Sequence, residues 1–94
     1  MEVLTLDSVI QKVENINKIS VIEEKINGFA YLEESARISA VSLGYTYSFI
    51  LESIKTIIKR LSDHDCAVNY EDTQTEIHEF LKVLYHMKNY QWSI

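Results

Sequence analysis

Apolar residues recur at helical spacing along a stretch that runs from about residue 29 to residue 61. Apolar or small side chains alternate there by four and three positions: Ala36, Ala40, Leu43, Tyr47, Ile50, Ile54, Ile57 and Leu61. This alternation keeps one stripe on one side of a helix. The pattern predicts a single helix of roughly 50 Å. A chain of 94 residues cannot easily cover such a rod, so we expect a dimer or a larger complex.

The expected long helix also carries a second apolar row and a glycine. The row consists of Ile38, Val41, Tyr45 and Phe49. Gly44 lies inside the same stretch, and glycine costs about 1 kcal/mol relative to alanine in a helix interior. We therefore expect a kink or a close helix crossing at Gly44.

Apolar spacing predicts another helix before the long one, over about residues 6–26. Thr5 is placed to cap its N-terminus, and the pair Asn27-Gly28 is typical of a helix stop. The segment Ser20-Val21-Ile22-Glu23 also matches a capping box. This match leaves open an alternative in which the helix breaks near Asn17–Ser20.

The C-terminal third of the chain predicts a loop followed by a third helix. Residues 62–72 are polar and show no periodicity, whereas helical spacing runs from Thr73 to about Asn89. Thr73 and Glu76 form a second capping-box pattern. The chain has no proline and only two glycines. Together these features predict a single all-α domain over 1–94, a three-helix bundle with one long central helix (about 29–61) that dimerisation completes.

The charge balance argues against two classes of binding partner. The chain carries 14 acidic and 9 basic residues, for a net charge of −5. This balance disfavours direct contact with nucleic-acid backbones and with anionic membrane surfaces. A single cysteine excludes an internal disulfide, and the N-terminus lacks the pattern of a signal peptide. We expect a soluble, cytoplasmic protein.

One short segment contains the residue types of a metal or nucleophilic site. Asp63-His64-Asp65-Cys66 offers four potential ligands, but their spacing matches no standard zinc pattern. Cys66 with His64, His78 or His86 could form a nucleophile–base pair, although no glycine-rich turn lies nearby to build an oxyanion hole. We expect no enzymatic activity, metal or cofactor. A small metal-binding or enzymatic protein using His64 and Cys66 is the remotest alternative.

Acidic residues are concentrated between Ser62 and Leu81, where no lysine or arginine occurs. They are Asp63, Asp65, Glu71, Asp72, Glu76 and Glu79. The plainer interpretation is electrostatic, because carboxylates stabilise helix N-termini and the cations just before this segment suit a helix C-terminus. The functional interpretation is an acidic surface that mimics nucleic acid and inhibits a nucleic-acid-binding protein.

Aromatic residues form the second set of candidate partner-binding positions. They are Tyr45, Phe49, Tyr90 and Trp92. Tyrosine and tryptophan are favoured in interfaces, although aromatic residues at helical spacing are more often part of a core. The sequence predicts a small protein-binding protein, such as an adaptor, inhibitor or chaperone, that acts through apolar helix faces. It would work as a homodimer or in a hetero-complex, with the acidic mimic as the alternative.

Overall fold

The computed structural model describes residues 3–63 and 70–92, with the side chains of 3–63 and 71–89. Its elements follow the order α1 (Leu6–Asn17), α2 (Ile22–Ile38), α3 (Ala40–Leu43), the 3-10 turn η1 (Gly44–Thr46), α4 (Tyr47–Ser62) and α5 (Tyr70–Trp92). No strand occurs within these described ranges. The all-α prediction is confirmed.

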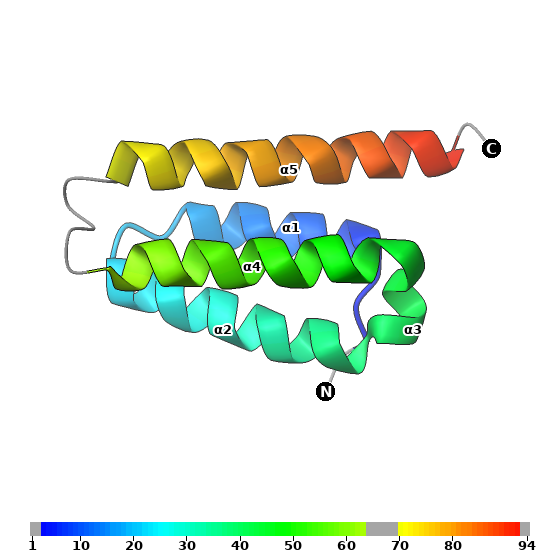
Figure 1. Cartoon of the computed structure of the whole chain (residues 1–94), viewed down its shortest axis with the longest axis horizontal. Coiled ribbons are helices and arrows are strands. Elements are labelled where there is room, and N and C mark those ends of the chain that lie inside the picture. The colour runs from blue at the N-terminus through cyan, green and yellow to red at the C-terminus, as the bar shows by residue number, and fades with distance from the viewer. Residues whose placement is uncertain (1–2, 64–69, 93–94) are drawn as a thin grey trace.

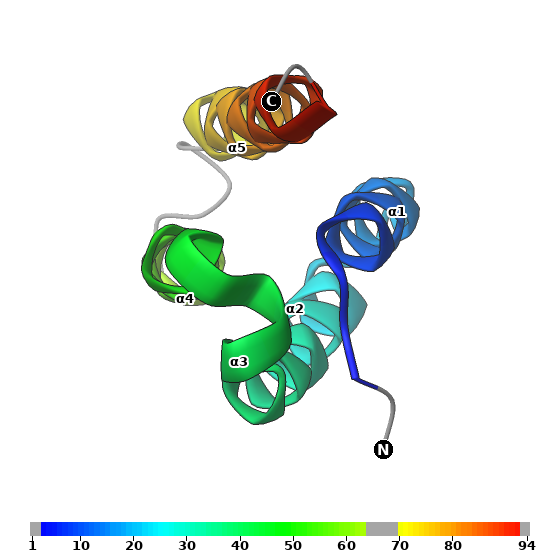
Figure 2. The same ribbon diagram turned by 90° about the vertical axis from the view of Figure 1, so that its right-hand side faces the viewer.

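The four longer helices pack side by side as a bundle. Consecutive members α1, α2, α4 and α5 run in opposite directions along the long axis (Figure 1). Viewed from the end, α5 lies next to both α4 and α1, and α2 lies on the far side (Figure 2). This up-down arrangement needs only short connections between neighbouring helices. The short helix α3 lies at the turn between α2 and α4.

The prediction of one helix over residues 29–61 is wrong, because the chain reverses between α2 and α4. Ser39 follows α2 with φ −95° and ψ 18°. Gly44 adopts φ 60° and ψ −131°, a conformation that only glycine reaches easily. The hydroxyl of Thr46 donates a 2.7 Å hydrogen bond to the carbonyl oxygen of Leu43 within the turn. Gly44 thus allows a full reversal where the sequence predicted only a kink or a close crossing.

One hydrophobic core joins all four long helices. Its buried members are Leu4, Val9, Ile10, Val13, Ile16, Phe29, Leu32, Ala36, Leu43, Ile50, Ile54, Ile57, Leu61, Ile77, Phe80 and Leu84. Most of the predicted stripe is therefore buried, although α2, α3 and α4 share it. The helices α1 and α5 cover this stripe within one chain. The prediction of a dimer therefore loses the argument that a long apolar helix would be left uncovered. Dimerisation itself stays a prediction.

The chain leaves helical structure between α1 and α2 near Asn17–Ser20, as the alternative prediction states. α1 ends at Asn17 and does not continue to residue 26. Thr5 caps α1 as predicted, since its hydroxyl accepts a 3.2 Å hydrogen bond from the Ser8 amide. α2 begins after Val21, which is its N-cap in place of Ser20 and makes no side-chain capping bond.

Gly28 does not end a helix, in contrast to its predicted role. It lies inside α2, where an added Cβ would come within 3.1 Å of Cγ1 of Ile16. Real Cβ contacts are almost always longer, so the missing side chain lets α1 and α2 approach closely. The helix-stop interpretation of Asn27-Gly28 is therefore wrong.

The last helix is longer than predicted. α5 begins at Tyr70 and extends to Trp92, so Thr73 lies within the helix and is no cap. Its side chain is buried in the bundle. Ser62 and residues 70–72 of the predicted loop are helical, and residues 64–69 lie outside the described residues.

Candidate protein-binding surfaces

Large apolar side chains are exposed where α2 turns into α3 and η1. Val41 is 96% exposed, Tyr45 66% and Ile38 55%; we call these three residues the corner surface. Val3 is also exposed and precedes Leu4, whose amide bonds to the Ser39 hydroxyl. The N-terminal segment therefore borders the same end of the bundle.

The direction of the corner side chains follows from the packing of α3. Leu43 in α3 is buried in the core. Residues two positions apart on a helix lie on nearly opposite sides. Burying Leu43 therefore directs Val41 away from the core. The exposure of Val41 is thus a consequence of the burial of Leu43.

Phe49 does not share the exposure of the other residues in the second apolar row. Its ring lies 5.7 Å from the ring of Phe80 on α5, centroid to centroid, at an angle of 56°. Such tilted aromatic pairs add to the apolar burial that holds helices together. Phe49 is half-buried against the core, so the structure places it at the α4–α5 contact and outside the corner surface.

The acidic residues are spread over several environments. Glu71 and Asp72 lie exposed in the first turn of α5, and Asp63 follows the end of α4. Glu76 forms an ion pair with Arg60 of α4. A basic side chain therefore lies within the acidic surface that the sequence predicts, because α4 and α5 are neighbours.

Glu79 borders a groove between α4 and α5. The groove is lined by Phe49, Ser53, Ile57, Glu76, Glu79, Phe80 and Val83. Its apolar members come from both helices, and its two carboxylates lie on α5. Such a groove can accept an apolar side chain of a partner with a basic group beside it.

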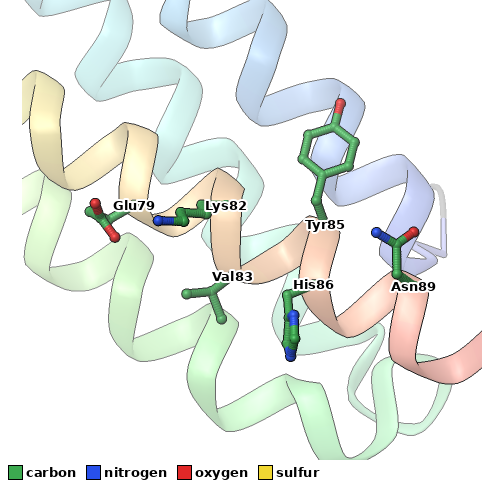
Figure 3. A pocket seen from close by; sticks show the side chains of 6 residues that line it. All are labelled: Glu79, Lys82, Val83, Tyr85, His86 and Asn89. Atoms are coloured by element: carbon green, nitrogen blue, oxygen red, sulfur yellow. The ribbon is translucent and has the colours of Figure 1, made fainter.

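The outer face of α5 forms an open, mixed surface (Figure 3). Its residues are Glu79, Lys82, Val83, Tyr85, His86 and Asn89. Tyr85 extends toward α1, where its hydroxyl donates a 2.9 Å hydrogen bond to Oε1 of Glu14. This hydrogen bond raises the pKa of Tyr85 above its ordinary value of 10.0. Ligand sites are usually concave and bury most of the ligand, so this open face is a poor candidate for a small molecule.

Some predicted site residues lie outside the described part of the chain. Asp65 and the candidate pair His64 and Cys66 belong to residues 64–69. Tyr90 and Trp92 belong to α5, but their side chains are not described. Among the residues that are described, no group of three or more histidine, cysteine, aspartate or glutamate side chains could hold a metal ion.

Two features of the structure were absent from the predicted site. Ile38 and Val41 belong to the second apolar row but not to the predicted partner-binding residues. Their helical spacing with Tyr45 is the signal that could have identified them. Lys25 is completely buried in α2. It lies four residues before the buried Phe29, so its register could have indicated an inward position.

Comparisons of the chain with protein-family models, curated proteins and solved structures find no match. None of the helices over 3–63 and 70–92 has both the length and the apolar character that crossing a bilayer requires. Function is therefore inferred from the geometry of the described residues alone.

Proposed function

We propose that this protein is a non-enzymatic protein-binding module that recognises another protein through the corner surface. The supporting observation is the exposure of Val41, with Ile38 and Tyr45 exposed within the same eight residues. Single exposed apolar side chains are common. Three large ones at one end of a small bundle are more typical of an interaction site. An adaptor, inhibitor or chaperone fits this description.

The acidic mimic receives less support from the same structure. A mimic of nucleic acid needs an extended field of one sign. Arg60 pairs with Glu76, and Lys82 lies beside Glu79 on the outer face of α5. These two cations interrupt the negative field, so the corner surface is the preferred site.

Site-specific photo-crosslinking tests the proposal, because it captures a bound protein of any identity. A photoreactive phenylalanine analogue replaces Val41, and a control replaces Ser48, which is also exposed but lies on α4. We expect a discrete cross-linked product with another protein from position 41 and none from position 48. Tyr45→Ser should weaken that product about tenfold or more, as truncating an interface anchor does. Equal products from both positions, or none from position 41, would contradict the proposal.

A further inference from the structure

We propose that the hinge between α2 and α4, residues 39–46, can straighten, so that two copies of this chain exchange halves. In the resulting dimer, residues 3–38 of one copy would pack against the α4 and α5 helices of the other. The interaction surface is the existing contact between α2 and α4, and its partner is a second copy of the chain. This inference goes beyond the proposed function, because its interaction surface is the α2–α4 contact, although Val41 and Tyr45 of the corner surface lie within the hinge.

The buried positions of α2 and α4 share one helical register across the hinge. Their buried apolar residues, together with Leu43 of α3, are Phe29, Leu32, Ala36, Leu43, Ile50, Ile54, Ile57 and Leu61. Every interval in this series is three, four or seven residues, as on one face of a single helix. Two helices joined by a reversing turn need no common register. The same side chains would therefore face inward in a straight helix as in the hairpin.

The hinge contains two residues with non-helical backbone angles. Ser39 has ψ 18°, and Gly44 has φ 60° and ψ −131°. The other hinge residues belong to α3 or η1, and both Leu43 and Thr46 have right-handed helical angles. The chain contains no proline that would block a straight helix. Rotation at Ser39 and Gly44, together with conversion of η1 from 3-10 to α-helical geometry, would therefore join α2 to α4.

Exchange between copies preserves the native contacts between the helices outside the hinge. A domain swap rebuilds the same contacts between two chains, which makes it a low-cost route to a dimer. The hydrogen bond from the Leu4 amide to the Ser39 hydroxyl joins the exchanged half to the first hinge residue of the same chain, so the exchange does not separate its two partners. The straightened hinge also gains backbone hydrogen bonds of an α-helix. The swapped dimer must still offset the entropy that is lost on association. This loss favours the monomer at low concentration.

Gly44→Ala tests the hinge directly. No heavy atom outside the neighbouring residues lies within 4 Å of a Cβ built on Gly44, so the substitution acts through the backbone. Alanine is strained at the positive φ of the closed hinge and favoured in a straight helix. Because each dimer contains two hinges, the dimerisation constant should rise roughly 100-fold or more. Light scattering should show a species of twice the 11.0 kDa chain mass where the wild type is monomeric.

The control and a labelling experiment distinguish a swap from other dimers. Ser48→Ala raises helix propensity at an exposed position outside the hinge, and it should leave the monomer–dimer balance unchanged. In a dimer of one isotope-labelled and one unlabelled chain, we expect intermolecular NOEs between methyl groups of α2 and α4. If Gly44→Ala stays monomeric, or forms a dimer without such NOEs, the proposal is overturned.

The wild type provides a second test should Gly44→Ala fail to fold. Wild-type protein is refolded from denaturant at two chain concentrations and then diluted. Refolding at high concentration should trap a dimer that returns slowly to monomer, because separation of a swapped pair requires unfolding of the exchanged halves. Refolding that yields only monomer at both concentrations would overturn the proposal.

Discussion

The backbone amide of Leu4 donates a 2.6 Å hydrogen bond to the hydroxyl of Ser39, 35 residues further along the chain. The same hydroxyl donates a 2.8 Å hydrogen bond to the carbonyl oxygen of Ser35. Leu4 and Ser39 are both buried. One serine side chain therefore satisfies a buried amide of the N-terminal segment and holds that segment at the end of α2.

Ser39→Ala should destabilise the protein by about 1–3 kcal/mol, because the buried Leu4 amide would lose its acceptor. Ser42→Ala is a matched control at an exposed position of α3. Chemical denaturation measures both variants, and hydrogen exchange should show faster exchange of the Leu4 amide in Ser39→Ala only. Equal stability of the two variants would contradict a structural role for this hydrogen bond.

Ile54→Ala and Ile57→Ala should each destabilise the protein by about 2–5 kcal/mol, through lost apolar burial and the cavity left behind. Both side chains are fully buried in the core. Lys55→Ala, at an exposed position between them, should change stability by less than about 0.5 kcal/mol. Thermal or denaturant unfolding measures the three variants. A melting shift of Ile54→Ala no larger than that of Lys55→Ala would show that the assigned helix register is incorrect.

Local periodicity was sufficient to predict which side of α4 is buried. Ile50, Ile54 and Ile57 have the predicted inward positions. The reversal before them could not be predicted, because the register continues through the turn and fits a straight helix equally well. Gly44 is compatible with both forms, since glycine accepts positive φ as readily as helical angles. Within one chain, the contact between α1 and α5 requires the reversal.

The roles of Gly28 and of the acidic residues could not be predicted from the sequence for a similar reason, because each role depends on how the helices pack. Gly28 has the same local signature whether it ends a helix or permits a close approach, and only the position of Ile16 distinguishes the two roles. The acidic positions on α5 were visible in the sequence, but the pairing of Glu76 with Arg60 depends on how α4 and α5 pack. Tyr45 was predicted as a site residue. Val41 was not, because its outward direction depends on the burial of Leu43 in the core.

Two polar contacts between α1 and α5 predict lower stability at high pH. Tyr85 donates to Glu14, and Nζ of Lys88 lies 2.8 Å from Oδ1 of Asp7. These hydrogen bonds raise the pKa of Tyr85 above 10.0 and that of Lys88 above 10.5. The folded state therefore binds both protons more tightly than the unfolded state. Their stabilisation is complete below these ordinary values and is lost as pH rises through the raised ones.

The double variant Tyr85→Phe with Lys88→Met measures this contribution. Denaturant midpoints are compared at about pH 9 and about pH 11, on either side of the ordinary tyrosine and lysine values. The wild type should lose more stability over this interval than the double variant. Tyr45→Phe is the control, because it removes an exposed tyrosine hydroxyl in η1, outside the contact between α1 and α5. Identical losses in the wild type and the double variant would contradict the linkage.

Glu71 and Asp72 provide the test that separates helix electrostatics from an acidic binding surface. Both lie in the first turn of α5, where a carboxylate interacts favourably with the helix dipole. Glu71→Gln with Asp72→Asn should therefore lower stability by about 0.3–1 kcal/mol per charge at low ionic strength. The loss should shrink in salt, which screens exposed charges. Glu79→Gln, exposed two turns later on the same helix, should have little effect. If the first-turn variant is as stable as the wild type but associates more slowly with the cross-linked partner, its acids belong to a binding surface, because peripheral charges act mainly on association rate.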